Sequence, residues 1–216
     1  MQFSERSKVF LVDDDERVSV AIARLLRAMG YQVETFASPE PFLERPRYPA
    51  PCCLILDLKL EHTNGLEVQR RLVASGRSVP IVFISAHGAI PDSVQAVKAG
   101  AIDFLTKPVH ADKLLAAVQA ALSNDSAALT RDRELAEDRT RVAKLTPRES
   151  EIAELVAQGF LNKEISFTLG VAVGTVKLHR ARVMDKLGVD SVPELVRMLD
   201  RIGRTPVPAR KATALA

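Results

Sequence analysis

Four aspartates stand directly after two runs of apolar residues, where their side chains could bind a cation. Asp13, Asp14 and Asp15 follow the apolar residues 9–12, and Asp57 follows residues 52–56. Carboxylates crowded at the ends of buried strands repel one another and lose solvation, so a cation or a helix N-terminus must stabilise them. Mg²⁺ suits a site that offers a few carboxylates, a backbone carbonyl and water. These residues predict such a site, provided that the two strand ends are neighbours.

The first 123 residues contain five predicted strands that would bring these aspartates together. Their interiors are β-branched or leucine-rich without polar alternation, as in parallel strands covered on both faces; they are residues 9–12, 33–36, 52–56, 81–85 and 103–106. Amphipathic helical patterns separate the strands, so we predict an α/β fold with a five-stranded, doubly wound parallel sheet.

Such sheets bind ligands beyond the carboxyl ends of their strands. Ser85 and Lys107 stand at that same edge, so we expect them to lie near Asp13, Asp14 and Asp57. Asp15 stands where the first helix begins, and we expect it to cap free backbone N–H groups there.

The composition indicates a soluble globular chain with room for two domains. Apolar residues make up 47% and charged residues 26% of its 216 residues, and no apolar run approaches the roughly 20 residues of a membrane span. The N-terminus lacks the pattern of a signal peptide, and the adjacent Cys52 and Cys53 indicate neither a disulfide framework nor a zinc site. We therefore expect a cytoplasmic protein with no membrane partner. Residues 145–216 hold 11 basic and 8 acidic side chains, which accounts for the net charge of +3 and hints at nucleic acid.

The C-terminal third carries the start and stop signals of four short helices. Residues 146–149 and 191–194 form predicted capping boxes, and a tight turn around Gly170 precedes the third helix, which indicates a helix-turn-helix domain. We divide the chain into a first domain of residues 1–123, a charged, helical linker of residues 124–144, a helix-turn-helix domain of residues 145–204 and a disordered tail of residues 205–216.

Four segments of the first domain, in this order, resemble the receiver domain of bacterial two-component response regulators: VDDD, LILDLKL, FISAHG and AGAIDFLTKP. The resemblance implies that Asp57 accepts a phosphoryl group from a sensor histidine kinase. It implies that Mg²⁺ is bound by Asp13, Asp14, Asp57 and the backbone carbonyl of Lys59. It also implies that Ser85 and Lys107 contact phosphoryl oxygens, that Phe104 is the switch aromatic, and that the Lys107–Pro108 bond is cis. Glu61 departs from the pattern, because many receivers have proline there, and this puts only the local loop shape in doubt.

Two blocks of the C-terminal domain, LTPRESEIAELVAQGFLNKEIS and VAVGTVKLHRARVMDKLGV, resemble the LuxR/FixJ type of helix-turn-helix domain. Lys163, near the N-terminus of the scaffold helix, is expected to contact phosphate. In the next helix, Val176, Val183 and Leu187 form a core stripe. The opposite face would enter the major groove with Thr175, Lys177, Leu178, Ala181 and Arg182. Arg180 and Lys186 flank this face and suit backbone contacts.

The leading hypothesis is a phosphorylation-switched transcription regulator that binds double-stranded DNA and is not an enzyme. The resemblance implies a homodimer when phosphorylated, with RNA polymerase as a further partner. The alternative is a phosphohydrolase with an aspartyl-phosphate intermediate. That chemistry usually occurs with a DxD motif at the end of the first strand, whereas Asp57 is followed by Leu58 and Lys59 in the third.

Overall fold

The computed structural model describes residues 7–86 and 90–204, and the chain divides into two compact units, Met1–Thr130 and Arg131–Ala216. The predicted tail, residues 205–216, lies outside the described residues. The predicted linker, residues 124–144, is divided between the two units rather than standing apart from them.

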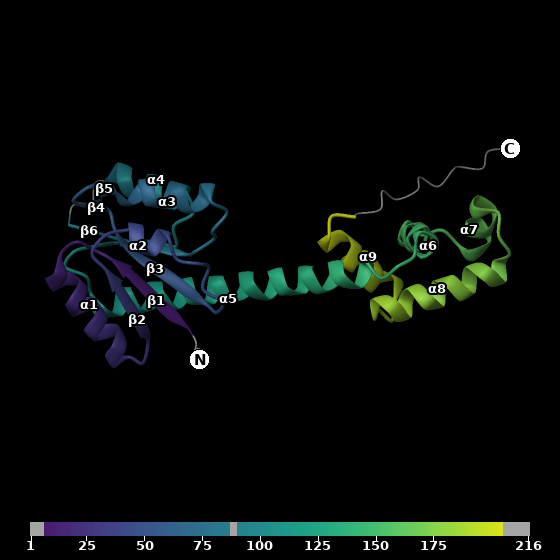
Figure 1. Cartoon of the computed structure of the whole chain (residues 1–216), viewed down its shortest axis with the longest axis horizontal. Coiled ribbons are helices and arrows are strands. Elements are labelled where there is room, and N and C mark those ends of the chain that lie inside the picture. The colour runs from purple at the N-terminus through teal and green to yellow at the C-terminus, as the bar shows by residue number, and fades with distance from the viewer. Residues whose placement is uncertain (1–6, 87–89, 205–216) are drawn as a thin grey trace. The chain divides into compact units, whose positions relative to one another are not determined.

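The first unit is built on a five-stranded parallel sheet with the strand order β2-β1-β3-β6-β7 (Figure 1). Its strands are β1 (Lys8–Val12), β2 (Gln32–Phe36), β3 (Cys52–Asp57), β6 (Ile81–Ser85) and β7 (Asp103–Thr106). This is the predicted doubly wound sheet, and each predicted strand agrees with an observed one to within a residue at either end.

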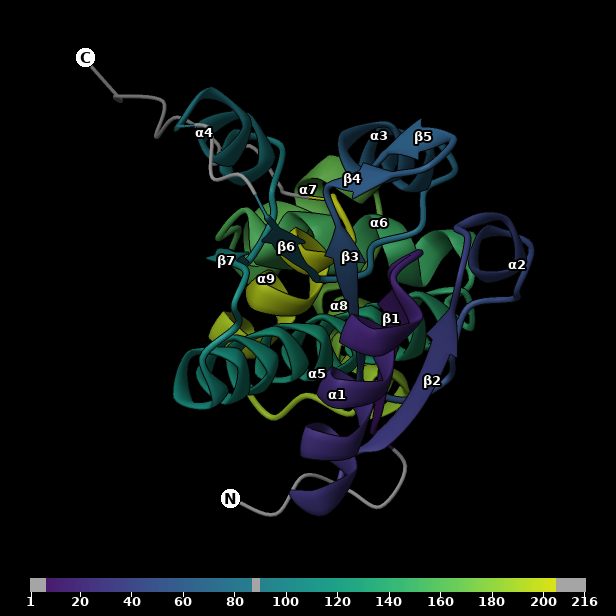
Figure 2. The ribbon, with the colours of Figure 1, turned by 90° about the vertical axis from the view of Figure 1, so that its left-hand side faces the viewer.

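Alternate residues of the strands face two separate cores, because side chains of a strand point to opposite faces. Val9, Leu11 and Ile55 pack against α1 (Glu16–Ala28) and the start of α5 (Ala111–Val142). Phe10 and Leu56 pack on the other face, which is covered by α2 (Glu40–Leu43), α3 (Gly65–Ala74) and α4 (Ile90–Lys98). Figure 2 shows α1 and α5 on one side of the sheet, with α3 and α4 on the other.

One feature of this unit is too short to be predicted from local sequence patterns. A two-stranded antiparallel pair, β4 (Lys59–Leu60) with β5 (Thr63–Asn64), follows β3 directly. Two-residue strands are too short to show any periodicity in the sequence. The helix α5 runs for 32 residues and includes most of residues 124–144, which agrees with the helical character predicted for that segment.

The second unit contains α6 (Pro147–Ala157), α7 (Asn162–Leu169), α8 (Val173–Leu187) and α9 (Val192–Arg201), with the end of α5. Val142, Ile152, Val176, Leu187 and Leu195 share its core. Gly170, at φ 63°, ends α7 in the left-handed conformation that glycine adopts without steric cost, and so makes the tight turn before α8.

Of the two predicted capping boxes, one is correct and one is wrong. The Thr146 hydroxyl accepts from the backbone N–H of Glu149, whose carboxylate accepts from the N–H of Thr146. The Ser191 side chain makes no such bond, and the Glu194 carboxylate accepts from the N–H of Asp190, one residue upstream of the predicted cap.

Candidate functional site

Three carboxylates meet at the carboxyl edge of the sheet. The register of β1 and β3 pairs Val12 with Leu56, so the next residues, Asp13 and Asp57, stand side by side at the strand ends. Among the described residues, Asp13, Asp14 and Asp57 form a group in which one ligand atom from each lies within 4.8 Å of the others. Asp13 and Asp57 are buried, whereas Asp14 is exposed. The strands therefore position the carboxylates of Asp13 and Asp57 in the protein interior and that of Asp14 at its surface.

Lys107 supplies the cation that the crowded carboxylates require. Its backbone N–H donates to the carbonyl of Ser85 (2.8 Å), which fixes it at the end of β6. Its Nζ lies 2.8 Å from Oδ2 of Asp13 and 2.7 Å from Oδ2 of Asp57. The next peptide bond, Lys107–Pro108, is cis, as the resemblance implies.

Burial and pairing act in opposite directions on these groups. Burial raises the pKa of Asp13, although hydrogen bonds from Lys107 and from the N–H of Asp15 counteract part of this effect. Burial would lower the pKa of Lys107, but the hydrogen bonds to Asp13 and Asp57 outweigh it and the pKa is raised. The ammonium of Lys107 is thus held in its charged form beside Asp57.

Asp14 and Asp15 differ in their contacts, as the sequence predicts. Oδ1 of Asp15 accepts from the backbone N–H groups of Arg17 (2.9 Å) and Val18 (3.4 Å) and so caps α1. Oδ2 of Asp14 accepts from the N–H of Glu61 (2.8 Å), which ties the loop after β3 to the end of β1. Asp14 therefore does not cap α1, and its carboxylate lies in the cluster with Asp13 and Asp57.

The donor set fits Mg²⁺. Three carboxylates from two strand ends provide hard oxygen ligands, and an exposed member leaves room for the waters that Mg²⁺ retains. Gly65 allows the loop behind the site to approach closely, because a Cβ there would lie 2.5 Å from the carbonyl oxygen of Asp57 and 2.9 Å from Phe83. Any larger residue would push this loop away from Asp57.

Ser85 and Phe104 lie on the neighbouring strands. Ser85 is fully buried at the end of β6, and Thr106 of β7 pairs with it in the sheet. The ring of Phe104 is partly buried, 6.4 Å from the ring of Phe83 between centroids. The structure thus places Ser85 on the strand beside Asp57 and Phe104 on the next strand outward.

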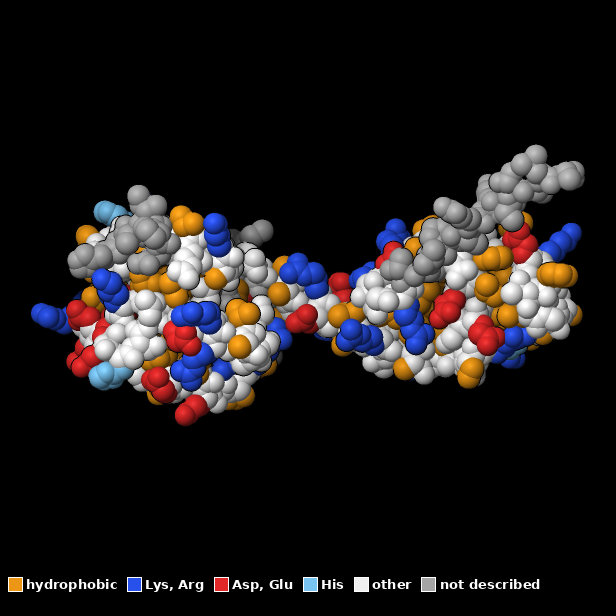
Figure 3. Space-filling model, turned by 90° about the horizontal axis from the view of Figure 1, so that it is seen from above, with side chains coloured by type: hydrophobic (Ala, Val, Ile, Leu, Met, Phe, Trp, Pro, Cys, Tyr) orange, Lys and Arg blue, Asp and Glu red, His pale blue; other side chains and the backbone are white. Residues whose placement is uncertain are grey.

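The predicted base-reading residues of α8 share one exposed face. Val176, Val183 and Leu187 are buried in the core of the unit, whereas the predicted base-reading residues are all exposed: Thr175, Lys177, Leu178, Ala181 and Arg182. Lys163 is exposed in the first turn of α7. Basic and acidic side chains are interspersed over the surface shown in Figure 3, so the candidate interface is identified by helix position rather than by a patch of one sign on that surface.

Two of the predicted DNA-contacting residues have partners within the protein. Nη1 of Arg180 donates to the side chain of Asn162 (3.2 Å). Nζ of Lys186 lies 2.6 Å from Oε2 of the buried Glu149, which the sequence presents only as part of a capping box. This ion pair and the N–H of Thr146 lower the pKa of Glu149 to about 2. Contact of Lys186 with DNA stays a prediction, and any such contact would compete with Glu149.

Two buried carboxylates of α5 were not expected from the sequence. Asp125 accepts from the N–H of Cys52 (2.8 Å) and so joins α5 to the start of β3. Asp138, inside the predicted linker, is fully buried among arginines. In the sequence, each appears only as an acidic residue within a long helical pattern. Such an acidic residue is more often exposed to solvent, so the pattern does not predict its burial.

The parallel sheet, the carboxylate cluster and the adjacent lysine define the first unit as a receiver domain. The four short helices of the second unit, with the tight turn at Gly170, define it as a helix-turn-helix domain. Residues 9–119 match the family described as response regulator receiver domain, and residues 143–199 match the bacterial regulatory proteins of the luxR family. Among the helices that the structure describes, none is long and apolar enough to cross a membrane.

Relatives match over nearly the whole chain. The response regulator protein TmoT of Ectopseudomonas mendocina is 40% identical over 198 residues, which is 92% of this chain and 90% of TmoT. The transcriptional regulatory protein FixJ of Azorhizobium caulinodans is 34% identical, covering 94% of this chain and 96% of FixJ. The solved structure of the response regulator StyR matches with a TM-score of 0.80 and 40% identity, over 90% of this chain and 98% of StyR. The chain belongs to the two-component response regulators that combine a receiver domain with a LuxR-type DNA-binding domain.

Proposed function

We propose that a sensor histidine kinase transfers a phosphoryl group to Asp57, and that this modification controls promoter binding by the second unit. The observation that carries the proposal is the contact of Asp57 with Lys107 beside two further carboxylates. A carboxylate needs a cation on the transferred oxygens to act as acceptor, and little covalent assistance.

The proposed reaction exchanges one bond for another. A carboxylate oxygen of Asp57 forms a bond to phosphorus while the bond from phosphorus to the kinase histidine nitrogen breaks. Asp13, Asp14, Asp57 and the Lys59 carbonyl would hold Mg²⁺, which neutralises charge on the phosphoryl oxygens when bound. Lys107 moves its ammonium from the Asp57 carboxylate to a phosphoryl oxygen, and the Ser85 hydroxyl donates to another.

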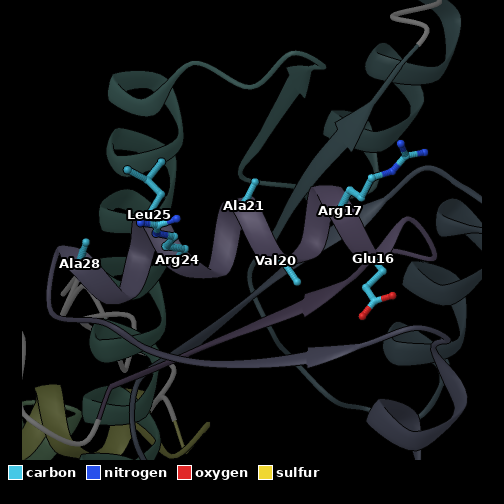
Figure 4. A pocket seen from close by; sticks show the side chains of 7 residues that line it. All are labelled: Glu16, Arg17, Val20, Ala21, Arg24, Leu25 and Ala28. Atoms are coloured by element: carbon cyan, nitrogen blue, oxygen red, sulfur yellow. The ribbon is translucent and has the colours of Figure 1, made fainter.

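An apolar surface of the receiver domain, next to this site, is available for the kinase to bind. An open groove of about 690 Å³ runs along α1 and is lined by Glu16, Arg17, Val20, Ala21, Arg24, Leu25 and Ala28 (Figure 4). A second groove shares Ala21 and Leu25 and reaches Lys107 and Pro108, so a helix of the kinase lying on α1 would bring its histidine to the site. Val20→Glu should therefore block transfer from a histidine-kinase domain selected for activity on the wild-type chain. Val73→Glu, at a similarly exposed valine of α3, should leave transfer unchanged.

Phosphorylation is proposed to act on the second unit through the receiver surface. The Ser85 hydroxyl moves to the phosphoryl group, which lets the Phe104 ring turn inward and changes the surface of α4, β7 and α5. Two chains then dimerise and bring two copies of α8 to neighbouring half-sites on DNA. Lys177, Leu178 and Arg182 read bases, Lys163 and Arg180 contact phosphates, and RNA polymerase is the further partner at the promoter.

Incorporation of phosphate from acetyl phosphate and Mg²⁺, followed by intact-mass measurement, tests the proposal. The wild-type chain should gain one phosphate, and Asp57→Asn should gain none while it stays folded. A stable phosphate on Asp57→Asn would overturn the assignment of the acceptor. Continuous release of phosphate at many equivalents per chain would instead favour a phosphohydrolase over a regulator.

A further inference from the structure

An ion cluster around the buried carboxylate of Asp138 joins the last turns of α5 to the DNA-binding unit. Both carboxylate oxygens of Asp138 accept hydrogen bonds, one from Arg141 on the same helix and the other from Arg201 on α9. Nη2 of Arg141 lies 2.5 Å from Oδ1, and Nε of Arg201 lies 2.8 Å from Oδ2. Asp138 and Arg141 both lie outside residues 9–119 and 143–199, the segments that the family models match.

Arg141 extends this cluster to the end of α8. Its Nη1 donates to the carbonyl oxygen of Leu187 (3.1 Å), the last residue of that helix. The final carbonyls of an α-helix lack partners within it and carry the negative end of its dipole, so a guanidinium there satisfies and stabilises them. A Cβ at Gly188 would lie 3.5 Å from the same Nη1, which shows that Arg141 packs directly on the turn that ends α8.

Asp138 determines where Arg141 lies. A long arginine side chain has many rotamers, and a fully buried carboxylate that binds it leaves one of them favoured. Arg201 holds the same carboxylate from α9, and the next residue after Arg141, Val142, is buried in the core that contains Val176 and Leu187. The end of α8 is therefore held by α5, and Arg201 of α9 holds the α5 carboxylate that orients this contact.

We propose that Asp138 and Arg141 are positioning residues for the recognition helix, so that the last turns of α5 belong to the DNA-binding machinery. The inference rests on the proposed DNA-binding role of α8. Base contacts depend on geometry held to within about 0.5 Å, whereas phosphate contacts depend mainly on charge. Loss of the cluster should therefore weaken sequence-specific binding before it weakens non-specific binding.

Binding of the full-length chain to two DNA probes tests this inference. One probe is a duplex that the wild-type chain enriches from a random-sequence pool, and the other is the unselected pool. Asp138→Asn is compared with Glu137→Gln, which changes the net charge by the same amount at the preceding residue. Glu137 is exposed and lies 3.9 Å from Arg133, outside the cluster. We expect Asp138→Asn to bind the enriched duplex roughly tenfold more weakly than Glu137→Gln, with both variants within twofold of each other on the pool.

Rescue and hydrogen exchange separate positioning from loss of folding. Arg141→Ala should show the same selective loss, and Arg141→Lys should recover part of it because a lysine can still donate to the Leu187 carbonyl. Amide exchange of residues 183–190 should be faster in Asp138→Asn, while residues 152–156 of α6 keep wild-type protection. Equal binding of the enriched duplex by Asp138→Asn and Glu137→Gln, or by Arg141→Ala and Arg141→Lys, would overturn the inference. A wild-type chain that enriches no duplex would overturn the proposed function instead.

Discussion

Nζ of Lys107 lies 2.7 Å from Oδ2 of Asp57, so the cation that the proposed phosphoryl transfer requires is already paired with the proposed acceptor. The same ammonium contacts Asp13, which is more deeply buried than Asp57. Lys107 thus has two roles in the unphosphorylated chain: it neutralises two carboxylates, and it marks the position that a phosphoryl oxygen would take. Both roles can be measured in one variant.

Lys107→Met should slow phosphorylation by acetyl phosphate by about 10²-fold, because a preorganised donor to the transferred group is lost. It should also lower the free energy of unfolding by about 3 kcal/mol in the absence of Mg²⁺, since two buried carboxylates lose their partner. Added Mg²⁺ should stabilise this variant more than the wild type. Lys113→Met, at an exposed lysine in the first turn of α5, serves as the control. Wild-type rates of phosphorylation in Lys107→Met would contradict the role of Lys107.

The neighbours Asp14 and Asp15 should separate metal binding from helix capping. Asp14→Ala removes an exposed carboxylate of the cluster and should weaken Mg²⁺ binding. Asp15→Ala removes the acceptor for two N–H groups of α1, so it should cost about 1 kcal/mol of stability and leave Mg²⁺ affinity nearly unchanged. Magnesium titration and chemical unfolding of both variants check this, and the reverse ranking of Mg²⁺ affinities would refute the division between the two residues.

The buried Glu149 should make the stability of the second unit depend on acid pH. Lys186 and the N–H of Thr146 hold the pKa of Glu149 at about 2 in the folded chain, below its ordinary value of 4.5. A lowered pKa contributes stability above the unfolded value, and this contribution is lost as pH falls from about 4.5 towards about 2. Glu149→Gln should therefore be less stable than the wild type at pH 7, with the difference shrinking below pH 4.

Thermal unfolding followed by circular dichroism between pH 7 and pH 2.5 measures this difference. Glu151→Gln is the matched control, because Glu151 lies on the same helix and pairs with Arg148 at the surface. A difference between wild type and Glu149→Gln that stays constant over this range would show that the Lys186 pair does not act through the charge of Glu149.

The carboxylate site could be predicted from the sequence because the rule behind it is simple. Parallel strands present their carboxyl ends at one edge, so the positions of Asp13, Asp57, Ser85 and Lys107 follow from the strand pattern alone. The buried ion pair of Lys186 could not be predicted in this way. Lys186 lies 37 residues after Glu149, and helical spacing shows a basic side chain on a flank without showing what faces it.

Local signals also failed where two of them compete. Ser191 and Glu194 have the spacing of a capping box, but the Glu194 carboxylate reaches the N–H of Asp190. The second unit likewise includes the end of α5, because Asp138 and Val142 are buried there among residues far along the chain. A helical pattern with mixed charges does not reveal which of its carboxylates will be enclosed.

Lys163 and Lys177 should differ in the kind of DNA contact they make. Lys163 lies in the first turn of α7, where a cation can reach phosphate, so Lys163→Ala should weaken binding to all DNA. Counterion release predicts that the negative slope of log K against log salt becomes shallower by about 0.9 for each phosphate contact removed. Arg180→Ala should act in the same way. In the wild-type chain, Arg180 must release its hydrogen bond to Asn162 before it can contact a phosphate.

Lys177 lies on the exposed face of α8, near the N-terminal end that enters the major groove in helix-turn-helix proteins. A long cationic side chain there can reach O6 and N7 of guanine, so Lys177→Ala should cost specific binding about 1–3 kcal/mol. Non-specific binding should change much less, because the lost contact depends on a base edge. The two variants are titrated across a salt series onto an enriched duplex and an unselected pool. If Lys163→Ala and Lys177→Ala lose affinity equally on both DNAs, Lys177 contacts phosphate and another residue of this face must read the bases.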